Sequence, residues 1–178
     1  MMNMKYSILR NTVTCLGLAA FSLVSAFAAD NGSVTIQGTV EAVNEIVVTT
    51  QSGYNALDLS AGATDQTIAV VNEKNNDPDG YTVTLVSANA AAAASAQARL
   101  KGAEAANGTE INYSIKYGTT VAEQEITLDA DGSKVITSVS AATDAAGVDK
   151  NLMITFSGLA WRNADTYSDT LTLTIASK

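Results

Sequence analysis

The chain has 178 residues, with eighteen acidic and ten basic side chains, a net charge of −8 and no histidine. The negative charge argues against nucleic acid as a partner, because a protein that binds phosphates needs a basic face. The absence of histidine excludes Ser-His-Asp and Cys-His catalysis, zinc sites that use histidine, and a pH switch based on imidazole.

Residues 1–28 have the pattern of a secretory signal peptide. Lys5 and Arg10 come before an almost wholly apolar run, and the segment 26–28 supplies the small-x-small pattern that a signal peptidase accepts. We expect cleavage before Ala29. The mature chain then keeps eight basic side chains against eighteen acidic ones, a net charge of −10.

A retained membrane helix or a lipid anchor in this stretch is disfavoured. The apolar run contains Ser22 and Ser25 and is short for a bilayer span of about 20 residues. A lipoprotein signal places its cysteine at the cleavage point, whereas a long apolar run follows Cys15. Because Cys15 is the only cysteine, we expect the mature protein to be one exported domain held by packing and sheet hydrogen bonds, without a disulfide.

The mature chain opens with a strand pattern over 33–42. Apolar residues alternate with polar ones, and Gly38 falls on the apolar side, so one face of an extended segment is apolar. A second strand pattern, 45–50, follows after only Val43 and Asn44, without a turn sequence that would fold the two into a hairpin. The first strand therefore needs a partner elsewhere, and we expect this partner to belong to another copy of the protein.

Further strand patterns recur at intervals of about ten to fifteen residues, which is typical of all-β sandwiches and barrels. They cover 67–71, 81–86, 111–117, 125–128, 134–139, 151–156 and 170–175. Their alternation predicts an inward face made of Ile46, Val48, Val83, Leu85, Tyr113, Ile115, Ile126, Leu128, Leu152, Ile154, Phe156, Leu171, Leu173 and Ile175. We expect an all-β fold.

Two polar stretches are expected to be turns. Residues 72–80 hold the only proline, and 129–132 should join the strands on either side as a hairpin turn. The first stretch contains N-x-D-x-D-G from Asn75, the opening of a calcium loop, but Val86 stands where such a loop needs a bidentate Glu. A plain β-turn is therefore the favoured interpretation.

Two local features have more than one interpretation. The alanine-rich run 88–98 is either a flexible inter-strand loop or a short surface helix, and a variable epitope is a less favoured alternative. Trp161 and Arg162 could form a subunit contact or a sugar-stacking surface, since both residue types are enriched at interfaces. The favoured alternative is a Trp that caps the end of the domain with Arg at its side.

The sequence contains no pattern that indicates an enzyme. Cofactor fingerprints are missing, and nothing points to a pair of carboxylates for glycoside hydrolysis. We expect no catalytic residue, no cofactor and no bound metal.

The two ends of the mature chain resemble the pilin subunits of chaperone-usher pili. The resemblance lies in the signal peptide, the alternating strand with Gly38, the immediate second strand and the closing run 164–175, which contains Y-x-D-T-L-T-L-T-I. The disulfide-free class-5 and archaic types are the most similar. The chain departs from many pilins in lacking a penultimate aromatic residue, since it ends in Ala176-Ser177-Lys178.

The resemblance implies an immunoglobulin-like β-sandwich that is incomplete, with its last strand supplied by donor-strand complementation. It divides the chain into a signal peptide (1–28), a donor-strand extension (29–43) and a pilin domain (44–178). It also implies three partners: other pilus subunits in a homopolymer, a periplasmic chaperone and an outer-membrane usher. The protein would be exported through the periplasm to the cell surface as part of a fimbrium.

Within this scheme the extension of one subunit fills a groove of its neighbour. The donor residues implied are Val34, Ile36, Gly38 and Val40, with Gly38 at a shallow pocket. The acceptor edge is expected at Leu171, Leu173 and Ile175, because no strand is expected after this one and its edge would stay open. Head-to-tail contacts that do not close give an open filament.

A secreted, self-complemented β-sandwich that recognises a carbohydrate or a surface protein is the alternative. The two hypotheses differ in where residues 33–42 go. In the alternative, the short link at Val43 and Asn44 has to carry the chain around its own domain, whereas exchange lets both strands continue nearly straight.

Overall fold

The computed structural model describes residues 32–159, 161 and 163–178. The predicted signal peptide, the cleavage site before Ala29 and Arg162 lie outside the described residues. The chain divides into two compact units, residues 1–38 and residues 39–178. In the first unit the described residues, 32–38, have no assigned strand, and the strands listed below belong to the second unit.

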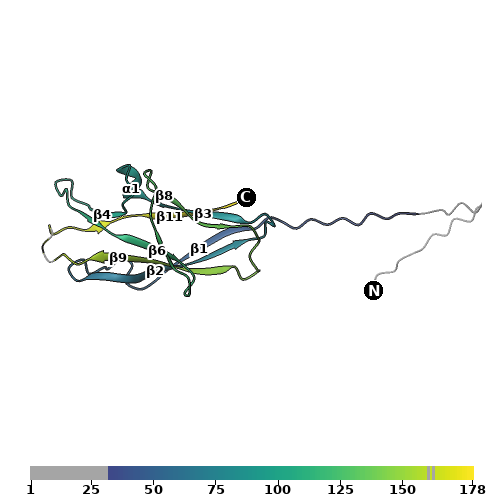
Figure 1. Ribbon diagram of the computed structural model, residues 1–178, viewed down its shortest axis with the longest axis horizontal. Helices are drawn as coiled ribbons and strands as arrows, with labels where there is room; N and C mark the ends of the chain where they lie inside the picture. The colour runs from purple at the N-terminus through teal and green to yellow at the C-terminus, as the bar shows by residue number, and fades with distance from the viewer. Residues whose placement is uncertain (1–31, 160, 162) are drawn as a thin grey trace, which may run out of the picture. The chain divides into compact units, whose positions relative to one another are not determined.

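The second unit consists of antiparallel sheets, as expected of an all-β fold (Figure 1). The largest sheet has the strand order β1-β2-β9-β6-β7, with β1 (Asn44–Thr50), β2 (Gly62–Asn75), β9 (Val148–Ser157), β6 (Ser114–Gly118) and β7 (Gln124–Ile126). A second sheet has the order β11-β3-β8, with β11 (Leu171–Ser177), β3 (Tyr81–Ser87) and β8 (Ser133–Val139). A small third sheet has the order β10-β4-β5, with β10 (Tyr167–Ser168), β4 (Arg99–Gly102) and β5 (Glu110–Asn112).

Side chains from all three sheets meet in one hydrophobic core. Alternation places them there: in β3 the buried residues Tyr81, Val83 and Leu85 alternate with half-buried ones. The predicted inward-facing residues that are buried are Val83, Leu85, Tyr113, Ile115, Leu128, Leu152, Ile154 and Phe156. Those that are partly buried are Ile46, Ile126, Leu171, Leu173 and Ile175. Val48 also lies on the inward side, where it lines a pocket with Leu152 and Ile154, but it is 45% exposed and so is not buried in the core.

Three strand predictions needed correction. The expected strand 111–117 is divided at Tyr113 into β5 and β6, which belong to different sheets. The turn expected at 72–80 begins later than predicted, because β2 continues to Asn75. Glu73 is therefore part of a strand and is completely buried. The short strands β4 and β10 were not predicted, since neither is long enough to show clear alternation.

A tight turn forms at 129–132 but does not make a hairpin. The Gly132 N–H donates to the Asp129 C=O at 2.9 Å, as expected for a β-turn. The flanking strands diverge, because β7 pairs with β6 whereas β8 pairs with β3. The turn therefore passes the chain from one sheet to the other.

The alanine-rich run begins as a short helix, one of its two expected forms. Helix α1 (Ala88–Ala92) starts at Ser87, whose side-chain oxygen accepts a bond from the Ala90 N–H and so caps the helix. Ala90 and Ala98 are 0% and 3% exposed. The run is thus not purely a surface feature, because two of its alanines pack in the core.

Gly80 fixes the turn between β2 and β3. Its φ is +89°, and a Cβ at this position would collide with the backbone of Val139 and Ala141. We expect Gly80→Ala to lower the free energy of unfolding by about 1 to 3 kcal/mol or more, because alanine disfavours this backbone conformation. Urea denaturation measures the change. Gly108→Ala is a control with open space around the added methyl group, and an equal loss of stability there would contradict the explanation.

Candidate functional site

Two edge strands, β1 and β11, lie beside each other without pairing. Among the described residues, β1 pairs only with β2 and β11 pairs only with β3. The Asn44 side chain at the start of β1 contacts the Ser177 side chain at the end of β11, so the two strands run in opposite directions. We call the space between them the β1–β11 gap.

Main-chain groups of β11 face this gap. At the two ends of the β11–β3 ladder, the Ala88 N–H donates to the Thr170 C=O at 2.9 Å and the Lys178 N–H to the Gly80 C=O at 3.1 Å. Hydrogen bonds alternate along an antiparallel ladder, so the even-numbered residues of β11 bond to β3. The odd-numbered residues direct their N–H and C=O groups to the gap: Leu171, Leu173, Ile175 and Ser177.

The opposite side of the gap is arranged in the same way. In the β1–β2 ladder, the Gln51 N–H donates to the Ile68 C=O at 2.9 Å and the Asn76 N–H to the Val43 C=O at 3.2 Å. The odd-numbered residues of β1 therefore bond to β2. The even-numbered ones direct their main-chain groups to the gap: Asn44, Ile46, Val48 and Thr50.

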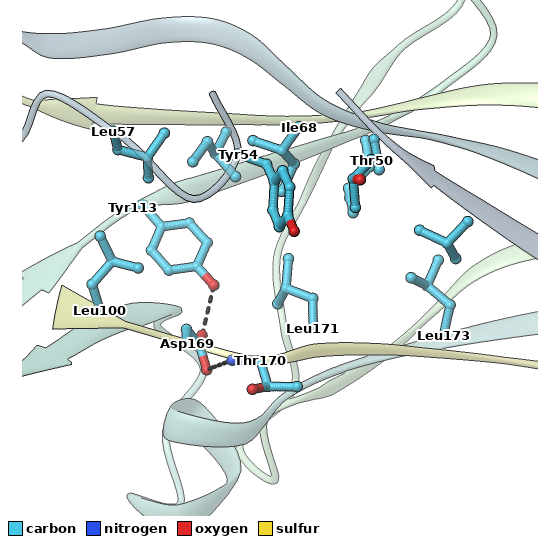
Figure 2. A pocket seen from close by; sticks show the side chains of 14 residues that line it. Thr50, Tyr54, Leu57, Ile68, Leu100, Tyr113, Asp169, Thr170, Leu171 and Leu173 are labelled. Carbon is cyan, nitrogen blue, oxygen red and sulfur yellow. Dashed lines mark hydrogen bonds between the residues drawn. The ribbon is translucent and has the colours of Figure 1, made fainter. Parts of the chain in front are cut away.

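The gap is also apolar. Figure 2 shows Leu171 and Leu173 pointing from β11 toward Tyr54, Ile68 and Thr50 on the other side of a pocket. This pocket has a volume of about 270 Å³. Strands on both sides of the gap thus offer unpaired backbone groups and apolar side chains together, which is how a sheet edge binds an additional strand.

A second pocket, of about 460 Å³, continues the first. The two share Tyr54, Leu57, Leu100 and Asp169, and the second extends along β10 to Asp165. Together they form a trough that follows the chain from Asp165 to Leu173 on β11.

Asp169 holds the floor of this trough in place. Its carboxylate accepts hydrogen bonds from the Tyr113 hydroxyl at 2.6 Å and from the Thr170 N–H at 2.8 Å, both drawn in Figure 2. It also accepts from the Ser87 hydroxyl at 2.6 Å and from the Asn89 N–H at 3.0 Å. Burial, together with the bond to Asp169, raises the pKa of Tyr113 above its ordinary value, so the phenol stays neutral and continues to donate. The floor is therefore fixed by side chains from several elements.

One end of the gap is closed by polar side chains. The Ser177 hydroxyl accepts from the Asn44 amide at 3.2 Å and from the Asn75 amide at 3.0 Å, and Asn75 also donates to the Asn44 side-chain oxygen at 3.0 Å. Asn75 is 1% exposed. The gap is closed at this end and hollow at the other, where the two pockets lie.

The residues predicted to act at this site lie in two different parts of the chain. Leu171, Leu173 and Ile175 lie together on β11, half-buried, with their side chains on the core side. The predicted donor residues are on a segment with no assigned strand, where Val34, Ile36 and Val40 are 87%, 93% and 87% exposed. An added Cβ at Gly38 would have no atom within 4 Å.

The sequence did not reveal the other side of the trough. Val48, Tyr54 and Leu57 line it, but Val48 was expected in the core and the loop that follows β1 was not considered. The one indication available was that β1 is apolar on its inward face. Which strand lies at a sheet edge depends on pairing, which alternation within a single strand does not report.

Two other predicted features are not part of the trough. Trp161 is 94% exposed in the connection between β9 and β10, so the favoured expectation that it caps the end of the domain was wrong. In the calcium-like turn, the side chains of Asn75 and Asp77 accept bonds from the N–H groups of Asp77 and Asp79, at 2.9 and 3.0 Å. These oxygens thus stabilise the turn itself.

Comparisons with protein-family models and with curated proteins found no match for this chain. Within the described ranges, no helix is long and apolar enough to cross a membrane. The same ranges contain no group of three or more His, Cys, Asp or Glu side chains placed to hold a metal ion.

Proposed function

We propose that this protein is a structural subunit of a surface pilus that polymerises by donor-strand exchange and supports adhesion or biofilm formation. The observation that carries the proposal is the β1–β11 gap, where two antiparallel edges present both backbone groups and apolar side chains. On this proposal the fold is an immunoglobulin-like sandwich that lacks one strand, and the missing strand belongs between β1 and β11.

The segment 33–42 has the pattern that the gap requires. The trough follows nine residues, from Asp165 to Leu173, which corresponds to roughly 30 Å of extended chain. A strand formed by 33–42 has about the same length. It has one apolar face for the pockets, and its other face is polar, as expected for solvent.

Burial of this apolar face would stabilise the contact strongly. Val34, Ile36 and Val40 are almost fully exposed in the single chain. Burying each of these side chains contributes roughly 1.5 to 3 kcal/mol, and a row of main-chain hydrogen bonds adds to this. A contact of this kind should dissociate slowly.

The resemblance to pilins implies two further partners, and the open edge gives a physical reason for the first of them. An unpaired apolar edge pairs readily with other chains, so a subunit needs a partner that covers it until assembly. A periplasmic chaperone would fill this role and an outer-membrane usher would receive the subunit, consistent with export through the periplasm to the cell surface. Each added subunit offers its own extension in turn, which gives an open filament.

The test is the heat sensitivity of the purified protein. We expect the mature chain to begin at Ala29 and to form a ladder of oligomers in mild detergent when unheated, because the exchanged strand is kinetically stable. Boiling should collapse the ladder to one band of the processed mass. A single monomer band without heating would contradict the proposal and favour a secreted, self-complemented binding module.

A further inference from the structure

One side chain, Asn76, fixes the direction of the segment that precedes β1. The Val43 N–H donates to the side-chain oxygen of Asn76 at 2.7 Å, and the Asn76 amide donates to the Glu41 C=O at 2.8 Å. The Asn76 N–H also bonds to the Val43 C=O at 3.2 Å. The side-chain amide thus takes the place of a further ladder residue and holds residues 41–43 in line with β1.

We propose that Asn76, together with the closed end at Asn44, Asn75 and Ser177, makes the gap accept the extension of a second copy rather than the extension of its own chain. The inference rests on the proposed donor-strand function and names the residues that select a second copy as the donor. Without such a device, one chain carries both a gap and a strand that fits it, and the two would combine within one molecule.

The Asn76 contacts oppose self-insertion at the point where the chain would have to turn. To enter its own gap, the segment before Asn44 must reverse direction and run back along β1. That reversal would break the bonds from Asn76 to Glu41 and Val43. The four residues 41–44 contain no glycine, and Val43 is β-branched, which disfavours the positive φ that a tight hairpin turn needs.

The closed end opposes the same path independently. A strand that turns back at Asn44 enters beside Ser177, where three side chains join β1 to β11. It would have to break these hydrogen bonds before it reached the pockets. An extension from another molecule meets no such barrier, because it can enter at the hollow end, near Thr50 and Leu171.

The experiment compares Asn76→Ala with the unaltered protein in the unheated gel. Asn76 is exposed, so we expect the variant to fold. Two hydrogen bonds are lost, and we expect the ratio of unheated monomer to ladder to rise about tenfold. In that monomer, amides of 33–42 should become protected from hydrogen exchange, because the segment now lies in its own gap.

Two further variants make the result specific. Asn76→Asp keeps an acceptor for the Val43 N–H but loses the donor to the Glu41 C=O. Its ratio of monomer to ladder should therefore fall between the ratios of the unaltered protein and of Asn76→Ala. Asn72→Ala is the matched control, since this residue of β2 also makes two side-chain hydrogen bonds, to the Ala146 C=O and to Asp149. Its ratio should not change.

The outcomes separate this inference from the proposed function. If the unaltered protein forms the ladder and Asn76→Ala forms it equally well, the role of Asn76 is overturned while the pilus proposal stands. An increase in monomer without protection of 33–42 would also overturn the inference. If the unaltered protein forms no ladder, the pilus proposal itself fails.

Discussion

Replacing Ile36 with Asp should abolish fibre formation while the subunit still folds. Ile36 is the middle apolar residue of the proposed donor strand and is 93% exposed in the single chain, so its own domain does not depend on it. In the gap of a neighbour, an unpaired carboxylate would replace an apolar side chain that contributes roughly 1.5 to 3 kcal/mol, with a further penalty of several kcal/mol. We expect at least a hundredfold fall in surface fibres, measured against soluble subunit in the periplasmic fraction.

The matched control is Gln37→Asp. Gln37 is the next residue of the same strand, and its side chain would point to solvent after exchange, so fibres should form normally. Normal fibres from Ile36→Asp would disprove the donor assignment. Loss of the soluble subunit together with the fibres would instead identify Ile36 as an ordinary core residue.

A mixture of two variants tests whether donor and acceptor belong to different molecules. Leu173 lines the pocket of the acceptor side, so Leu173→Asp should block that side and leave the extension intact. An Ile36→Asp copy keeps a sound gap, and a Leu173→Asp copy keeps a sound donor. On the exchange mechanism the mixture should form a dimer but no larger oligomer. The reason is that one copy has no working donor strand and the other has no working gap.

Local alternation accounts for the strands that the sequence predicted. The segment 81–86 became β3 (Tyr81–Ser87) with one face buried, because period-two patterning is a property of the segment itself. The predicted acceptor residues Leu171, Leu173 and Ile175 lie on β11, which pairs only with β3 among the described residues. Their role as acceptors stays a prediction, which the experiments above test.

The remaining features depend on residues that are distant in sequence. Val48 lies beside the gap and not in the core because β1 is an edge strand, a fact set by the pairing of all the strands. The hydrogen bond from the Asn76 amide to the Glu41 C=O joins residues that are 35 positions apart, so no local sequence pattern predicts it. Glu73 was assigned to a polar turn, because a charged residue near Asn and Lys is usually exposed. Its burial requires partners from other strands, which alternation in one strand does not predict.

These partners form a polar network that joins the two larger sheets. The Glu73 carboxylate is 0% exposed and accepts hydrogen bonds from Tyr81 at 2.9 Å, Tyr117 at 2.7 Å and Thr137 at 2.8 Å. It also forms an ion pair with the Lys150 ammonium at 2.8 Å. Burial raises the pKa of both tyrosines above the ordinary value, with Glu73 adding to the effect, so both hydroxyls stay protonated and donate. Tyr81 and Thr137 belong to the β11-β3-β8 sheet, whereas the other members belong to the five-stranded sheet. The network thus connects sheets that no disulfide joins in the described part of the chain.

Glu73→Ala should therefore destabilise the subunit by about 3 to 5 kcal/mol, measured by urea denaturation, because it leaves the Lys150 ammonium without its counter-charge and three hydroxyl groups without their acceptor. Asp129→Ala is the control, since its ion pair with Lys134 is exposed and should contribute no more than about 1 kcal/mol. Lys150→Met in the Glu73→Ala background should recover part of the loss, because it removes the partly buried charge that was left without its counter-ion and fills the space with an apolar side chain. If Glu73→Ala cost no more than Asp129→Ala, the network would not hold the two sheets together, and their packing would have to rest on the hydrophobic core alone.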